Sequence, residues 1–131
     1  MAGLVVVDTD LLIDFLRGRG EGAALVRELI TTHQLRLTAV TAFEIRLASD
    51  FLERKERITR LFRSRTLPLD LASALTAGRL HAALLDEGRA IGLADALQVG
   101  ICLRHGLPFA TRNRTHFERV HELELIDLDA G

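Results

Sequence analysis

The sequence has little of several residue types that often stabilise a fold or build a binding site. It contains one cysteine, two prolines, a single lysine (Lys55), and neither tryptophan nor tyrosine. One cysteine excludes an internal disulfide, and the position of Cys102 in an apolar run predicts a small buried hydrophobic residue, as in proteins of a reducing cytoplasm. Aromatic platforms for stacking single-stranded bases are scarce, because the six phenylalanines lie mostly in apolar patterns.

Charge and hydropathy exclude further classes. The net charge is −1, so any site for a polyanion must be a local one. No window approaches the roughly 18 consecutive apolar residues of a membrane span, and the N-terminal residues do not resemble a secretion signal. With 131 residues, of which 48% are hydrophobic, the chain is expected to form a single domain over residues 1–131, in the cytoplasm and without a membrane partner.

The aliphatic run from Leu4 to Val7 ends abruptly at Asp8. Four such residues in succession predict a short strand that is buried on both faces in a parallel sheet. Ligands of open α/β sheets bind at the carboxyl ends of the strands, where Asp8 is expected. The following residues have helical spacing, so Asp8 is also a candidate N-cap for the next helix. The local sequence leaves both interpretations open.

A second acid, Glu44, lies in a predicted helix from Ala42 to about Leu52. Thr41 and Glu44 match the capping-box pattern, which gives Glu44 a purely structural interpretation. The helical face that Glu44 shares with Leu47, Ala48 and Phe51 instead predicts a side chain directed toward the core. A carboxylate in that environment requires a partner.

A third acid, Asp95, is one of only two strongly polar residues in the segment 90–103; the other is Gln98. A helix in this segment is apolar on nearly every side and is expected to be buried. Asp95 falls in its first turn if the helix begins near Gly92, where the helix dipole favours a negative charge. Aspartate is rarely buried without a partner, so this position also suggests a functional acid.

The remaining patterns predict the surroundings of these acids. Residues 71–87 form a long helix whose core face is expected to contain Leu71, Leu75, Gly78, Ala82 and Leu85. Short strands are expected at 107–111 and over the last apolar residues, 123–128. Residues 53–65 contain six basic and two acidic side chains. They are interpreted as a solvated helix face, as a basic rim that attracts phosphate or an acidic partner, or as both together.

If Asp8, Glu44 and Asp95 meet at one edge of the sheet, their charges repel and raise their pKa values unless a cation neutralises them. Oxygen ligands without a neighbouring cysteine or a histidine pair favour Mg²⁺ or Mn²⁺ over zinc. Such an ion can activate water and stabilise charge on a phosphoryl oxygen. The three acids therefore predict a metal-dependent site.

Four segments in this order and spacing resemble a known family: residues 6–14, 41–45, 91–97 and 110–117. The chain resembles the PIN domains over essentially its whole length, and within them the VapC-type ribonuclease toxins of bacterial toxin–antitoxin pairs. The resemblance implies a PIN-like three-layer α/β/α fold with a small central parallel sheet. It also implies an Mg²⁺- or Mn²⁺-dependent endoribonuclease that uses metal-activated water and leaves 5′-phosphate and 3′-hydroxyl ends. Asp8, Glu44 and Asp95 would then be the catalytic metal ligands.

One segment departs from the family pattern. Many relatives carry a fourth acid there, whereas residues 111–117 contain none, and Asn113 and His116 stand where a carboxylate is found. Asn113 can still offer a carbonyl oxygen or hold a metal-bound water, which favours a single ion. Thr111 is expected to orient one of the acids through its hydroxyl. Thr111, Arg112 and Arg114 are candidate contacts to the RNA, because phosphate contacts position a nucleic acid without reading its sequence.

The resemblance also implies partners: a cognate antitoxin that binds beside the active site, and a second copy of the chain in a homodimer. The apolar residues Leu12, Phe15 and Leu16 exceed what a small sheet needs, and we interpret them as part of such an interface. An alternative function is a catalytically weak PIN-like module that binds RNA or protein, which the missing fourth acid favours. A phospho-receiver domain also places acids at strand ends, but the later strands have no lysine to support that reading.

Overall fold

The computed structural model describes residues 3–128, which form four strands and seven helices. The strands are β1 (Val5–Val7), β2 (Leu35–Thr38), β3 (Thr66–Leu67) and β4 (Phe109–Ala110). They pair in the order β3-β2-β1-β4, and every pair is parallel. Parallel neighbours need crossover connections, which the intervening helices provide.

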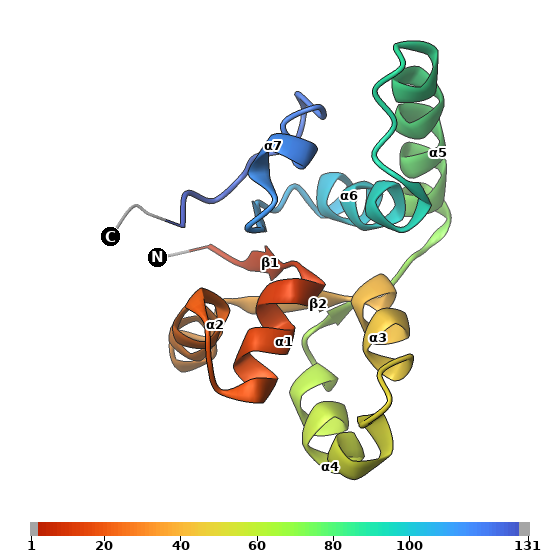
Figure 1. Cartoon of the computed structure of the whole chain (residues 1–131). Helices are drawn as coiled ribbons and strands as arrows, with labels where there is room; N and C mark the ends of the chain where they lie inside the picture. The colour runs from red at the N-terminus through yellow and green to blue at the C-terminus, as the bar shows by residue number, and fades with distance from the viewer. Residues whose placement is uncertain (1–2, 129–131) are drawn as a thin grey trace.

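The helices cover both faces of this sheet. They are α1 (Thr9–Arg17), α2 (Glu21–Thr31), α3 (Ala39–Arg46), α4 (Phe51–Phe62), α5 (Leu71–Asp86), α6 (Leu93–His105) and α7 (Arg114–Phe117). Figure 1 shows α1 to α4 on one side of the sheet and α5 to α7 on the other. The predicted three-layer α/β/α architecture with a small parallel sheet is confirmed.

The central strand β1 explains why its sequence is uniformly apolar. Val5 and Val7 belong to the hydrophobic core shared with α1, α2 and α4, whereas Val6 belongs to the core shared with α5, α6 and α7. Alternate side chains of a strand point to opposite faces, so a strand covered on both sides needs apolar residues throughout. β1 lies between β2 and β4, which places the residue after it at the middle of the sheet edge.

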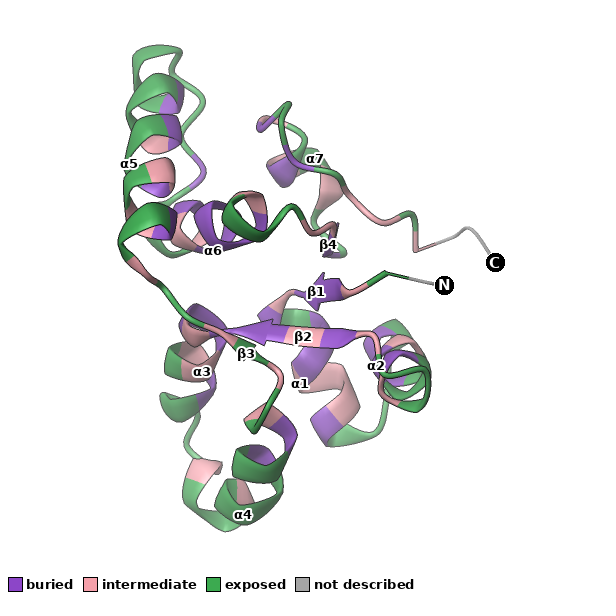
Figure 2. Cartoon of the chain, turned by 180° about the vertical axis from the view of Figure 1, so that it is seen from behind, coloured by how far each residue is buried: buried purple, intermediate pink, exposed green. Residues whose placement is uncertain are grey.

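The core face of α5 differs from the prediction. The leucines expected to be buried are exposed, with Leu71 at 76%, Leu75 at 65% and Leu85 at 55%. The buried face instead contains Ser73, Ala77, Leu80 and Leu84. Both faces of this helix carry apolar residues at helical spacing, so periodicity could not choose between them. Figure 2 shows the outward, exposed side of α5 in green.

The face of α5 that carries small residues is the buried one, because α5 packs closely against α6. A Cβ atom added at Gly100 of α6 would lie 2.5 Å from the carbonyl oxygen of Ser73 and 2.7 Å from Cβ of Ala77. Gly100 therefore allows α5 and α6 to approach closely. A face of large leucines would hold the two helices further apart.

Replacing Gly100 with alanine is therefore expected to lower the free energy of unfolding by about 1–3 kcal/mol, the usual cost of overpacking a core. Gly78 of α5 is the matched control, because a Cβ atom there would meet nothing within 4 Å. Gly78→Ala should instead stabilise by about 0.5–1 kcal/mol, since alanine is favoured over glycine inside a helix. Urea unfolding of both variants measures the two changes, and equal effects would contradict the close approach.

Two other predicted elements are corrected. The helix expected from Ala42 to Leu52 is divided into α3 and α4, and α3 starts earlier because Thr38 is its N-cap and accepts a hydrogen bond from the backbone N–H of Thr41. The strand expected over 123–128 is reduced to one bridge between Phe109 and Leu125.

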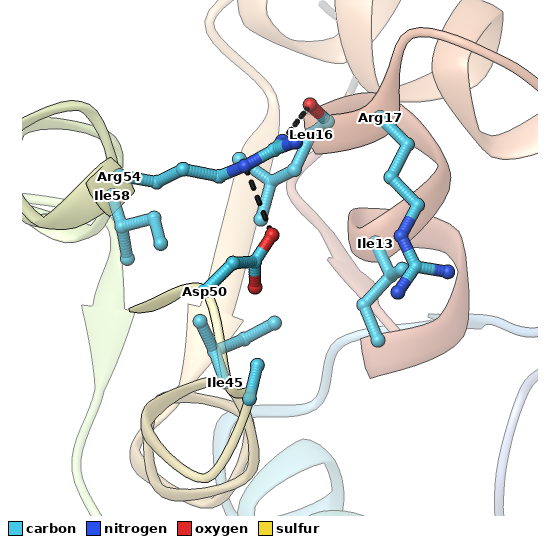
Figure 3. Close-up of a pocket in the computed structure, with 8 residues that line it drawn as sticks. Ile13, Leu16, Arg17, Ile45, Asp50, Arg54 and Ile58 are labelled. Carbon is cyan, nitrogen blue, oxygen red and sulfur yellow. Dashed lines mark hydrogen bonds and ion pairs between the residues drawn. The ribbon is translucent and has the colours of Figure 1, made fainter. Parts of the chain in front are cut away.

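Helix α4 contains most of the basic segment, and it is mainly a solvated helix. Ile58 and Leu61 are buried while its charged residues are exposed or half-buried. Arg54 forms an ion pair with Asp50 at 3.1 Å and donates to the backbone oxygen of Leu16, at the carboxyl end of α1. Figure 3 shows these groups around a pocket between α1, α3 and α4. Arg54 therefore has a structural role in joining helices.

None of the helices in residues 3–128 is long and apolar enough to span a membrane.

Candidate functional site

The carboxyl ends of the three neighbouring strands gather polar side chains at one edge of the sheet. Asp8 follows β1, Thr38 is the last residue of β2, and Thr111 follows β4. The strands are parallel, so these three residues lie at the same edge. Open α/β sheets bind ligands in this position.

Asp8 accepts hydrogen bonds on both of its carboxylate oxygens. Oδ1 accepts from the backbone N–H of Thr9 at 2.8 Å and from Nε2 of Gln98 at 3.3 Å. Oδ2 accepts from Oγ1 of Thr111 at 2.7 Å. Asp8 is the N-cap of α1, so the structural interpretation holds. A cap needs only the first of these bonds, and the other two fix the carboxylate from two further elements.

The environment of Asp8 raises its pKa from 3.8 to about 6. Burial is the main cause, because removal from water disfavours the charged form. The hydrogen bonds from Thr111 and Thr9 act in the opposite direction, and the negative charges of Asp10 and Asp95 raise the pKa further. The protein therefore holds this carboxylate near two like charges. A bound cation would compensate the electrostatic repulsion between these negative charges.

Glu44 is connected to the region around Asp8 by a hydrogen bond with the buried Thr9. Its Oε1 accepts a hydrogen bond from Oγ1 of Thr9 at 2.6 Å, and that hydroxyl lies 3.0 Å from Oγ1 of Thr41. Thr41 lies inside α3, so the predicted capping box is wrong. The predicted core face is also wrong, since Leu47 is 70% exposed. Glu44 is half-buried and directed toward the residue that follows Asp8.

Asp95 lies in the first turn of α6, as predicted, but its side chain is less buried than expected, with 38% of its surface exposed. Its partner is His116 of α7. Oδ2 of Asp95 lies 2.9 Å from Nε2 of His116, which also lies 2.8 Å from the backbone oxygen of Ile91. Asp95 acts electrostatically on Asp8, so two of the three predicted acids influence each other directly.

Gln98 is a central residue of the site that the sequence analysis did not select. Its side chain is 1% exposed, and its amide nitrogen donates to Asp8. Its amide oxygen accepts from the hydroxyls of Thr38 and Thr41, the latter at 3.1 Å. Gln98 is the other polar residue of the apolar segment 90–103, three positions after Asp95 and on the same helix face. That spacing was a signal that could have identified it.

Replacing Gln98 with leucine is expected to lower the free energy of unfolding by about 1–3 kcal/mol, since the buried hydroxyls of Thr38 and Thr41 lose their acceptor. Gln34→Leu is the control, because Gln34 bonds at an exposed position and its loss should cost less than about 0.5 kcal/mol. Chemical unfolding of the two variants measures the difference. A Gln98→Leu protein as stable as the wild type would contradict the network.

The segment 111–117 contributes side chains that already have partners within the protein. Arg112 forms an ion pair with Asp14 at 2.7 Å, and Arg114 donates to the backbone oxygen of Ile126 at 2.6 Å. Asn113 is exposed, and its backbone N–H donates to Oγ1 of Thr111 at 3.1 Å. Contacts of these residues with a metal or RNA stay predictions.

The donor set has the chemistry that Mg²⁺ or Mn²⁺ prefers, because Asp8, Glu44, Asp95 and Asn113 offer only oxygen. Among residues 3–128, no three His, Cys, Asp or Glu side chains lie close enough together to hold one ion. Mg²⁺ is commonly bound by one or two carboxylates and keeps several waters. The pair Asp8 and Asp95, with its unfavourable repulsion, fits that type of site.

Comparisons with known proteins agree with the fold. The sequence profile of the PIN domain matches residues 5–123. The chain is similar to the structure of FitAcB from Neisseria gonorrhoeae (22% identity, TM-score 0.79, 98% of this chain and 100% of that one). It is also similar to DNA-bound VapBC from Salmonella typhimurium (22% identity, TM-score 0.77, 97% of this chain and 99% of that one). A toxin–antitoxin complex from Klebsiella pneumoniae is a further match (18% identity, TM-score 0.74, 95% of this chain and 97% of that one).

At these identities the solved structures establish the fold alone, and a search of curated proteins found no match. The family follows from the profile, which covers most of the chain, including all three predicted acids. This chain belongs to the PIN domain family.

Proposed function

We propose that the chain is a metal-dependent endoribonuclease and the toxin of a toxin–antitoxin pair. The observation that carries this proposal is the carboxylate of Asp8, which is held at the carboxyl edge of the sheet with its pKa raised to about 6 and Asp95 close enough to contribute. A buried acid beside like charges is typical of functional sites. The PIN family membership supports nuclease chemistry at this edge.

In this proposal Asp8 and Asp95 bind one Mg²⁺ or Mn²⁺ ion directly, and Glu44 and Asn113 support it through water. The ion would activate water and neutralise charge on the scissile phosphate. Thr111 and Gln98 fix the carboxylate of Asp8 from β4 and α6. Glu44 is fixed by Thr9. Thr111, Arg112 and Arg114 are the candidate contacts to the RNA backbone, and Arg112 would have to exchange its ion pair with Asp14 for a phosphate.

Incubation of the purified chain with total cellular RNA tests this function. Discrete fragments with 5′-phosphate ends are expected in Mg²⁺ or Mn²⁺ and not in chelator. Intact RNA in every lane, from folded protein that is free of antitoxin, would contradict it.

The proposed antitoxin partner is supported by the solved structures, several of which are toxin–antitoxin complexes. The residues first interpreted as an exposed interface do not support it, because Leu12 is fully buried and Leu16 is 8% exposed. These two side chains belong to the core shared with α2 and α4. The expectation that they exceed what the sheet needs was wrong for these two residues, because both pack with side chains of α2, α3 and α4 in one core.

The exposed apolar surface lies on other elements, and we propose that it forms the homodimer. Its members are Phe43 of α3 and Leu47 just after that helix, Leu69 before α5, Leu71 and Leu75 in the first turns of α5, and Leu93 of α6. Phe43, Leu69 and Leu93 also line one wholly apolar groove of about 400 Å³. An apolar surface of this kind is typical of a permanent interface between copies.

Leu69→Glu is expected to convert the dimer to a monomer, because it places a charge in the groove. Leu52→Glu is the matched control, since Leu52 is 71% exposed on α4, away from the groove. Sedimentation velocity measures the oligomeric state, and circular dichroism checks folding. A wild-type monomer, or an unchanged dimer in Leu69→Glu, would contradict this surface.

A second candidate function is a PIN-like module that binds RNA or protein with little turnover. The observation that favours it is His116, which pairs with Asp95 in the segment where many relatives carry another acid. RNA that is retained by the folded chain but stays intact in every metal would identify this function.

A further inference from the structure

The contacts of His116 determine where its hydrogen lies. Nε2 is 2.8 Å from the backbone oxygen of Ile91 and 2.9 Å from Oδ2 of Asp95. A carbonyl oxygen can only accept a hydrogen bond, so Nε2 must be the donor. Whether the ring is neutral or charged, this nitrogen carries a hydrogen. It therefore has no free lone pair with which to bind a metal ion.

The core holds the ring in this orientation. The ring of Phe117 meets that of His116 edge to face, with centroids 5.1 Å apart, and Phe117 itself is 1% exposed and packs against Phe109 of β4. The side chain of His116 is 22% exposed. The imidazole is thus fixed by a buried neighbour on one side and by Ile91 and Asp95 on the other.

We propose that His116 is a positioning residue that fixes the carboxylate of Asp95 and the start of α6 and does not bind the metal through Nε2. The N–H of Nε2 donates to Oδ2 of Asp95, and Oδ1 would then be the oxygen with which Asp95 holds a cation. The bond to Ile91 also holds the backbone that leads into α6. Hydrogen bonds of this kind orient carboxylate ligands and are commonly important for metal affinity. The inference rests on the proposed function, in which Asp95 is a ligand.

Two variants separate the hydrogen bond from the ring. His116→Gln keeps an N–H group near the place of Nε2, whereas His116→Phe keeps a ring and removes the donor. Mn²⁺ binding, measured from the electron paramagnetic resonance signal of the free ion, is expected to weaken about 10–100-fold in His116→Phe. It should stay within a few-fold of the wild type in His116→Gln. In RNA cleavage, His116→Phe should lower kcat and leave KM for RNA nearly unchanged.

Asp95→Asn distinguishes failure of this inference from failure of the proposed function. The first case is that the wild type binds Mn²⁺ and Asp95→Asn weakens this binding. If His116→Phe then binds Mn²⁺ as tightly as the wild type, His116 has no positioning role, although the metal site itself is supported. If the wild type does not bind Mn²⁺, or Asp95→Asn binds it equally well, both proposals are overturned. Equal losses in His116→Gln and His116→Phe would also contradict a role based on the N–H donor.

Nuclear magnetic resonance of the wild type decides the question without a variant, should a substituted protein fail to fold. Long-range ¹H–¹⁵N spectra are expected to show Nε2 of His116 protonated, both before and after addition of Mg²⁺. Loss of that hydrogen on addition of Mg²⁺ would identify the ring as a ligand and overturn the inference.

Discussion

Replacing Asp8 with asparagine is expected to lower the rate of RNA cleavage about a thousandfold. A catalytic metal contributes several kcal/mol to the transition state, and each 1.36 kcal/mol corresponds to about a factor of ten. Asparagine keeps an oxygen that can accept from the backbone N–H of Thr9, so the cap of α1 is retained while the negative charge is lost. Initial rates on a defined RNA fragment measure the change.

Asp86→Asn is the matched control, because Asp86 is exposed at the end of α5. It should cleave at the wild-type rate. Both variants must unfold as cooperatively as the wild type, so that a loss of activity is not a loss of folding. Undiminished cleavage by Asp8→Asn would remove Asp8 from the reaction and with it the reason for placing the site at this edge.

The second large effect is on stability. In chelator, the free energy of unfolding of the wild type relative to Asp8→Asn is expected to fall by about 1–3 kcal/mol as the pH rises from about 4 to about 6.5. The pKa of Asp8 is raised from 3.8 to about 6 in the folded protein, so in this range the folded state keeps a proton that the unfolded state has lost. Stability therefore decreases with increasing pH.

Urea unfolding at several pH values measures this difference, and the comparison with Asp8→Asn cancels the contributions of the other acids. Above pH 6.5, addition of Mg²⁺ should restore part of the loss in the wild type and change Asp8→Asn little, because the cation compensates the charge of Asp8. A pH-independent difference between the two proteins would show that Asp8 is not held in a destabilising environment.

The sequence predicted those parts of the fold in which the pattern of apolar residues is compatible with only one arrangement. Val5 to Val7 must be covered on both sides, so β1 could be placed in the centre of a parallel sheet with Asp8 at its end. The burial of Cys102, which raises the pKa of its thiol to about 12, followed from the same reasoning. The face of α5 could not be predicted in this way, because both faces are apolar and the choice depends on Gly100 of another helix.

The candidate site shows a similar division. Each acid could be selected from its local environment, but its partners depend on side chains that are far away in the sequence. Glu44 accepts from Thr9, and Asp95 pairs with His116, which no local pattern near either acid specifies. Gln98 was visible as a polar residue in an apolar helix, but its role depends on the meeting of α6 with β1 and β2.

The decisive test of a metal site between Asp8 and Asp95 is diffraction from a crystal soaked in Mn²⁺. We expect an anomalous peak at ligand distance, about 2 Å, from carboxylate oxygens of both Asp8 and Asp95, and no peak at that distance from Nε2 of His116. A fully occupied Mn²⁺ site elsewhere on the chain, with no peak between Asp8 and Asp95, would contradict it.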